Sequence, residues 1–155
     1  MSAPEPRAIF EAFLGAVNRR DGAVLVDLVH PDYIETHPQS GESVHGVQNL
    51  QAIIEAYPGG FEDKGSDRIV GIEDRWVMTP AFTLLRIEGS GDTFTGVQRA
   101  RYPDGSIWHI ISIGEIRDRR VWRVQTFFAQ AFEAPAWRAS WVERTQDQEG
   151  ATKEP

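Results

Sequence analysis

The 155-residue sequence contains no cysteine, which excludes disulfides, thiolate nucleophiles and cysteine-ligated zinc. No apolar run approaches the roughly 20 residues that a membrane-spanning helix needs. Met1–Pro6 lacks the basic patch and apolar core of a signal peptide. An HExxH motif and a clustered Asp-rich loop are also missing, so we expect no metal site. Together these absences predict a cytoplasmic protein without membrane attachment.

Positive charge is scarce, with 16 Lys and Arg against 23 Asp and Glu and a net charge of -7. Such a chain repels a phosphate backbone, and we expect no nucleic-acid partner. Hydrophobic residues make up 41% of the chain, which is typical of a globular domain. We expect a single domain over residues 1–142. Apolar residues almost disappear after that, which predicts a flexible polar tail over 143–155.

Apolar residues in the first half recur at helical spacing. Asp21 suits the N-cap of a second helix, and Pro31 should end that helix at His30. An extended segment over residues 32–37 follows, and Pro58-Gly59-Gly60 ends a third helix. The apolar stripes of the three helices are Ile9, Phe10, Phe13, Leu14 and Val17; Val24, Leu25, Leu28 and Val29; and Val47, Leu50, Ile53, Ile54 and Tyr57.

The second half has the pattern of an antiparallel sheet, and Pro135 opens a short final helix in which Trp137 and Trp141 share a face. Turns are expected at Gly89–Asp92 and Pro103–Gly105. The turn around Asp118-Arg119 lacks glycine, which predicts either strain at Arg119 or a longer loop. Helices before strands predict an α+β fold, with helices on one face of a bent antiparallel sheet. The expected strands are residues 68–72, 76–78, 82–88, 94–102, 107–117 and 121–132.

The strand expected over residues 107–117 is apolar on both faces, and the helices can cover only one of them. A second copy of the chain is the simplest cover for the other face. We therefore predict a homodimer through the outer sheet face. One face carries Trp108, Ile110, Ser112, Gly114 and Ile116, and the outer face carries Ile107, His109, Ile111, Ile113 and Glu115.

The order of these elements resembles the NTF2-like superfamily, and within it the SnoaL-like group of polyketide-cyclase and ketosteroid-isomerase relatives. The resemblance covers about Arg7 to Val142 and rests on pattern and order. Its most telling stretch is Ile113-Gly114-Glu115-Ile116-Arg117-Asp118 followed by residues 122–128, which is similar to the last hairpin of that family. It implies a cone in which the sheet and helices enclose an apolar cavity. It also implies a small hydrophobic, oxygen-bearing ligand.

Family resemblance places a catalytic carboxylate on the last strand, at the position of Thr126 in this chain. A threonine can only orient a water or a ligand oxygen. His37 and Glu35 are then the best remaining catalytic candidates, because they alternate with Tyr33 on one face of a short strand. A histidine beside an orienting acid can act as a general base. The alternative is that this strand is an edge whose three side chains are solvated.

Ligand contacts are expected from Tyr33, Tyr57, Gln98, Trp108, Thr126 and Phe128. Arg99 and Arg101 would bind an anion if they faced the cavity. A three-residue Pro103–Gly105 turn favours the other register, in which Gln98 and Ala100 share the Trp108 face.

Two functions remain open. The first is a cofactor-free acid–base enzyme, an isomerase, cyclase, dehydratase or hydrolase acting on a hydrophobic metabolite. The second is a non-catalytic ligand-binding or scaffold domain, which the threonine at position 126 favours.

Overall fold

The computed structural model describes residues 2–56, 76–77, 82–101 and 106–144. The strand expected over 68–72, the turn at Pro103–Gly105 and most of the tail expected over 143–155 lie outside these ranges. Within the described part of the chain, no helix is long and apolar enough to cross a membrane.

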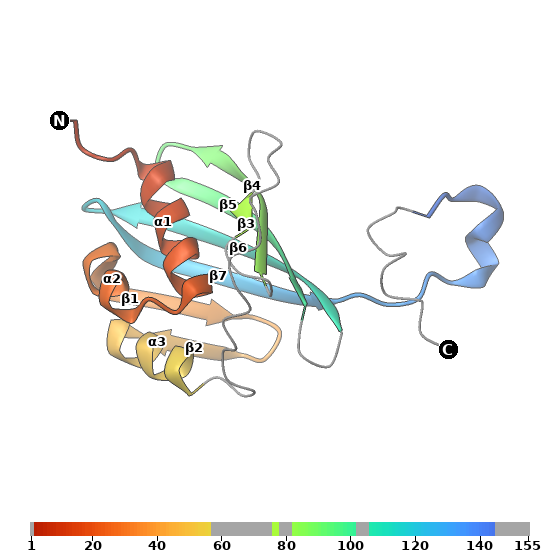
Figure 1. Cartoon of the computed structure of the whole chain (residues 1–155), viewed down its shortest axis with the longest axis horizontal. Coiled ribbons are helices and arrows are strands. Elements are labelled where there is room, and N and C mark those ends of the chain that lie inside the picture. Colours follow the sequence, from red (N-terminus) through yellow and green to blue (C-terminus); the bar gives the residue numbers. More distant parts are fainter. Residues whose placement is uncertain (1, 57–75, 78–81, 102–105, 145–155) are drawn as a thin grey trace.

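The described strands form one sheet in the order β2-β1-β7-β6-β5-β4-β3 (Figure 1). The strands predicted over 82–88, 94–102, 107–117 and 121–132 are present, and their bounds lie within two residues of the prediction. The bounds of the strand over 107–117 are those predicted. No strand was predicted over residues 42–45, and this segment is an edge strand that pairs with β1. The strands are β1 Val29–His37, β2 Glu42–His45, β3 Trp76–Val77, β4 Phe82–Ser90, β5 Thr93–Arg101, β6 Ile107–Arg117 and β7 Arg120–Gln130.

The sheet is mixed, and this corrects the expectation of a wholly antiparallel one. β1 runs parallel to β7, with Glu35 opposite Val124 and Thr36 opposite Gln125. The other pairings are antiparallel. A parallel pair needs a long crossover, and here nearly the whole domain lies between the two strands.

Three helices pack against the sheet: α1 Pro6–Arg19, α2 Gly22–Leu28 and α3 Gly46–Glu55. The predicted stripe of α1 lies in or against the core, whereas Val24 on α2 and Ile53 on α3 are exposed. The Asp21 side chain caps α2 by accepting a hydrogen bond from the Val24 amide at 3.2 Å. α2 ends at Leu28, two residues before the predicted end at His30, because the residue before a proline favours an extended backbone. The extended segment therefore begins at Val29 and not at residue 32. α1 crosses the inner face and contacts β4, β5, β6 and β7, while α3 lies along β1 and β2 (Figure 1).

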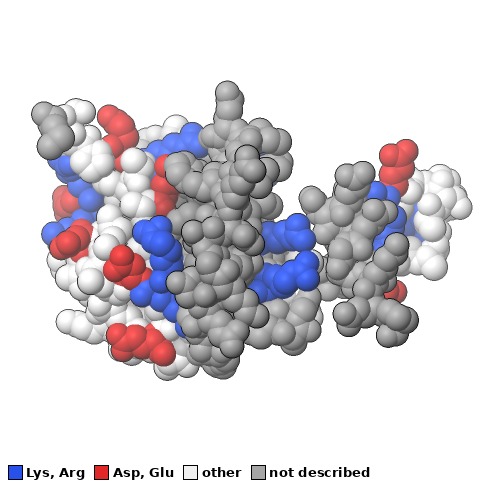
Figure 2. Space-filling model, in the orientation of Figure 1, with Lys and Arg blue, Asp and Glu red and all other residues white. Residues whose placement is uncertain are grey.

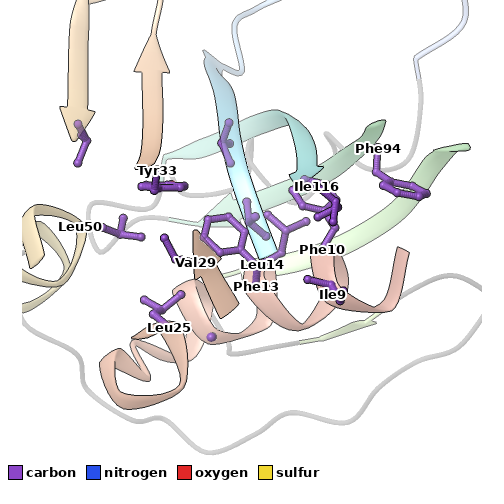
Figure 3. Packing of buried hydrophobic residues seen from close by; sticks show 14 of the residues in the cluster. Ile9, Phe10, Phe13, Leu14, Leu25, Val29, Tyr33, Leu50, Phe94 and Ile116 are labelled. Atoms are coloured by element: carbon purple, nitrogen blue, oxygen red, sulfur yellow. The ribbon is translucent and has the colours of Figure 1, made fainter. Parts of the chain in front are cut away.

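Two glycines let α1 lie close to the sheet. A Cβ at Gly114 would overlap the Phe10 ring, and one at Gly96 would come within 2.6 Å of Leu14 Cδ1. Phe10 and Leu14 therefore occupy space that side chains on β5 and β6 would otherwise fill. Figure 3 shows these residues continuing into a cluster that includes Phe13 and Tyr33.

The β6–β7 turn has two residues, since Arg117 pairs with Arg120. Asp118 and Arg119 both take the left-handed conformation, with φ of 49° and 60°. The strain predicted at Arg119 therefore occurs at Asp118 as well, because this type of two-residue hairpin turn needs positive φ at both of its residues.

The final helix, η1 Ala136–Trp141, is a 3-10 helix that stands away from the rest of the domain (Figure 1). Three residues per turn place residues four apart about 120° away from each other. The expectation that Trp137 and Trp141 share one face is therefore wrong. Both side chains are more than three-quarters exposed.

The packing of α1 on Gly114 predicts the effect of a single methyl group. Gly114→Ala should destabilise the fold by about 1–3 kcal/mol, because the new Cβ displaces the Phe10 ring. Urea unfolding measures the change. Adding Phe10→Leu should recover part of the loss, so that the double variant is more stable than the sum of the single effects. Strict additivity would contradict the contact.

Candidate functional site

A cavity of about 150 Å³ opens between α1, α3 and the inner face of the sheet. Apolar side chains from both helices and from the sheet make most of its wall. The apolar members are Phe13, Leu14, Val17, Val44, Leu50, Ile53, Ile54, Ile110, Val124 and Phe128. The polar members are Asn18, Arg20, Glu35, His37, Gln98, Ser112 and Thr126.

The Glu35 carboxylate is the centre of the polar side of the cavity. The Tyr33 hydroxyl donates to its Oε2 at 2.7 Å, and the Thr126 hydroxyl donates to its Oε1 at 2.9 Å. His37 Nε2 lies 3.0 Å from the same Oε1. Tyr33, Glu35 and His37 alternate along β1, so their side chains leave the same face of the strand. The solvated edge considered as the alternative is not what the structure has, because the Glu35 side chain is only 13% exposed.

Thr126 meets Glu35 because β1 lies beside β7. The parallel register puts Glu35 next to residues 124 and 125 of β7, and the Thr126 hydroxyl reaches it across the strands. The Ser112 hydroxyl lies 3.3 Å from Thr126 Oγ1 on the neighbouring strand. Glu35 of β1 thus brings a carboxylate within hydrogen-bonding distance of the hydroxyl at position 126.

The hydrogen bond to Glu35 determines which ring nitrogen of His37 carries the hydrogen. An ionised carboxylate only accepts, so Nε2 must carry the hydrogen that points to Glu35. In the neutral ring, Nδ1 is then an acceptor. Nδ1 has no hydrogen-bond partner among the described residues. The ring also packs edge-on against Phe128, with 5.5 Å between the ring centroids.

Glu35 shifts the pKa of both neighbours upward. Its hydrogen bond is the main cause that raises the pKa of His37 above the ordinary 6.5, and partial burial opposes the rise. Burial raises the pKa of Tyr33 well above 10.0, with a further contribution from the Glu35 charge. Tyr33 therefore stays a neutral donor to Glu35 at physiological pH.

A second polar pair lies on the same cavity. Asn18 Nδ2 donates to Gln98 Oε1 at 2.6 Å, and both side chains are buried. Sequence analysis included Gln98 but missed Asn18. The available signal was a polar residue four positions after Leu14, where the apolar stripe of α1 continues.

The remaining predicted contacts divide three ways. Thr126, Phe128 and Gln98 line the cavity. Tyr33 lies behind Glu35, and Trp108 is not among the described lining residues, since its indole turns to donate to Ser106 Oγ at 2.9 Å. Tyr57 lies outside the described residues.

The register places both arginines of β5 away from the cavity. Ala100 pairs with Trp108 and Gln98 with Ile110, so Arg99 and Arg101 take the outer face with His109. Among the other histidines, His30 bridges β1 to Asp118 at 3.3 Å, and His45 contacts Ser43. No cluster of three metal-ligating side chains occurs over the described ranges.

Residues 10–124 match the SnoaL-like domain. The chain belongs to the SnoaL-like family. No curated protein has a matching sequence.

Solved structures share the SnoaL-like fold over most of the chain. An NTF-2 like protein of unknown function from Burkholderia xenovorans LB400 is 29% identical, with a TM-score of 0.68 over 90% of this chain and 94% of the other. A candidate ketosteroid isomerase from Kribbella flavida DSM 17836 is 22% identical, with a TM-score of 0.70 over 90% and 89%. An LEH-like epoxide hydrolase from M. tuberculosis is 15% identical, with a TM-score of 0.54 over 78% and 80%.

The contact between His37 and Glu35 predicts the titration of the histidine. Wild-type His37 should titrate above 6.5, and Glu35→Gln should lower its pKa because the main cause of the shift is removed. Because the folded-state pKa is raised, the resulting stability is fully present below pH 6.5 and is lost as pH rises through the folded pKa. NMR titration of the imidazole signals measures the pKa.

Glu42→Gln is the matched control for this titration. Glu42 also raises the pKa of His37, but it is the least of the causes. Its removal should lower the pKa less than Glu35→Gln does. Equal shifts in the two variants would contradict the assignment to the hydrogen bond.

Proposed function

We propose that the cavity is the active site of a cofactor-free acid–base enzyme for a small hydrophobic, oxygen-bearing molecule. One observation carries this proposal: His37 lines the cavity, and its Nε2 is hydrogen-bonded to Glu35. The other ring nitrogen, Nδ1, is therefore the basic one. A histidine poised by a carboxylate exchanges protons near neutral pH.

In this proposal each polar residue has a distinct task. His37 Nδ1 takes a proton from a substrate carbon or from a water, and returns it to another atom. Glu35 is the positioning residue, since it fixes the tautomer and stabilises the imidazolium that forms. Tyr33 and Thr126 keep Glu35 in place through their hydroxyl groups. Thr126, Gln98 and Phe128 also contact the ligand, and the apolar wall excludes water.

The reaction class follows from what a histidine can do without metal or nucleophile. Isomerisation moves a proton from one carbon to another, and dehydration removes a proton from carbon and returns it to the hydroxyl that leaves as water. In cyclisation the deprotonated carbon attacks a carbonyl whose oxygen then takes the proton. In epoxide opening the deprotonated water attacks a carbon and the proton goes to the epoxide oxygen. Relatives of the same fold include isomerases, a candidate cyclase and an epoxide hydrolase.

A ligand-binding protein without catalysis is the second candidate. One observation favours it: all three hydrogen bonds to Glu35 also satisfy a buried carboxylate, as stability alone would require. Activity that depends on His37 separates the two candidates.

We also propose that the outer sheet face is a homodimer interface. Ile111, Val97 and Phe127 pair across β5, β6 and β7 in one apolar row. Ile111 remains 40% exposed although it lies in the centre of the sheet. The described helices pack on the opposite face, so a second copy would cover this row.

Catalysis is tested with two small probes of different chemistry. His37→Gln keeps a donor for Glu35 but cannot exchange a proton, so activity should fall by about 100-fold or more. Deuterium exchange at the α-carbons of cyclohexanone, followed by NMR, detects enolisation. Hydrolysis of cyclohexene oxide, followed by gas chromatography, detects epoxide opening.

His45→Gln is the control, because His45 lies on the exposed edge strand β2 away from the cavity wall. It should keep the wild-type rate. Rates equal to buffer for both probes, in wild type and variant alike, would favour the ligand-binding candidate.

The interface is tested by placing a charge in the apolar row. Ile111→Lys should convert a dimer of 17.4 kDa chains into monomers, because an unpaired ammonium cannot be buried between the sheets. Val26→Lys is the control, since Val26 is similarly exposed but lies on α2. Light scattering after size exclusion gives the mass. A monomeric wild type would refute the interface.

A further inference from the structure

We propose that Asn18 and Gln98 form the specificity element of the cavity and select a ligand that carries a primary amide or a similar paired donor and acceptor. This inference rests on the cavity of the proposed function and adds the chemical class of its ligand.

The pair is buried, and its hydrogen-bonding capacity is only partly used. Each side chain is 4% exposed, and one hydrogen bond of 2.6 Å joins them. A carboxamide has two N–H donors and an oxygen with two lone pairs. The bond between the two therefore leaves the Gln98 amino group and the Asn18 carbonyl with spare capacity.

The spare groups are directed to the cavity. Neither side chain has another hydrogen bond among the described residues. No side-chain nitrogen or oxygen of the described residues is both fully buried and unpaired. The free atoms must then reach an accessible surface, and both residues line the cavity.

The pattern does not depend on how the two amides are oriented. Nitrogen and oxygen of an amide can exchange places when the group flips. If both groups flip, Gln98 donates to Asn18, and the pair presents the Asn18 amino group and the Gln98 carbonyl. In either arrangement one donor and one acceptor stand side by side, which an amide matches with its own carbonyl and amino group.

The Asn18–Gln98 pair and the hydrogen-bonded group that contains Glu35 and His37 lie at different places on the cavity wall. Gln98 is opposite Ile110 on β6, and Ser112 follows two residues later on the same face. Such diagonal neighbours are about 7–8 Å apart. The cavity therefore has two polar ends separated by the apolar Ile110 and Phe128, which face each other across β6 and β7.

A cavity of about 150 Å³ holds a molecule of the size of benzene. The ligand that fits both ends is an apolar body of one ring, with an amide-like group against Asn18 and Gln98. Its reacting position then lies toward His37.

Three probes with the same number of non-hydrogen atoms test the recognition: benzamide, acetophenone, which has an acceptor but no N–H donor, and cumene, which has neither donor nor acceptor. Amide signals of the full-length protein, followed by NMR during titration, give the dissociation constants. Wild type should bind benzamide at least about tenfold more tightly than the other two, because only benzamide satisfies both free groups.

Two variants remove one partner each. Gln98→Leu and Asn18→Leu should abolish the preference for benzamide, and cumene should bind as well or better. Gln98→Met is the second choice at that position because it keeps the length of the side chain. Near-ultraviolet circular dichroism checks the fold of each variant.

His37→Gln separates this inference from the proposed function. It should keep the order of the three affinities, because it leaves the amide pair untouched. Equal affinities for the three probes in wild type, no binding of any of them, or a preference for benzamide that survives both leucine variants would overturn the inference. The activity test of His37 is independent of each of these results.

Discussion

A carboxylate on the inner face of a sheet needs hydrogen-bond donors, because a buried charge without them costs far more than the fold can supply. Glu35 is such a group, and its donors come from both sides of the β1–β7 boundary. Tyr33 and His37 lie beside Glu35 because the three residues alternate along β1. Thr126 lies beside Glu35 because β1 and β7 pair in a parallel register. The tautomer of His37 and the arrangement of hydroxyl groups on the polar side of the cavity follow from satisfying this one charge.

The cavity itself depends on where packing is closed and where it is not. Phe10 and Leu14 fill the space above two glycines of the sheet, so the first half of α1 lies tightly on β5 and β6. Further along α1, Val17 and Asn18 line the cavity, and Asn18 reaches β5 through its hydrogen bond with Gln98. Phe10 and Leu14 thus hold α1 against the strand backbone, and residues nearer the end of α1 form part of the cavity wall.

Local patterns predicted most of the elements, because helical and strand periodicities are properties of neighbouring residues. The face shared by Tyr33, Glu35 and His37, and the outward direction of Arg99, also followed from alternation and from the length of one turn. The contact of Glu35 with Thr126 could not be predicted in this way. It joins residues 91 positions apart through a parallel pairing, and no short-range pattern reports which strand becomes the neighbour of β1. Threonine at position 126 consequently pointed to a missing acid, although the acid is present on the adjacent strand.

The proton transfer proposed above changes the charge at one polar end of the cavity, while the Asn18–Gln98 pair at the other end stays neutral. Before proton transfer the dyad carries the single negative charge of Glu35. Once His37 takes a proton, the dyad is neutral overall and the negative charge has moved to the substrate. A substrate oxyanion in an apolar cavity needs donors that are already oriented. The amino group of the Asn18–Gln98 pair is an oriented, neutral donor at the opposite end. In the proposed reaction, an amide there stabilises developing negative charge without adding a buried positive one. The pair that is proposed to select the ligand would then also assist its reaction.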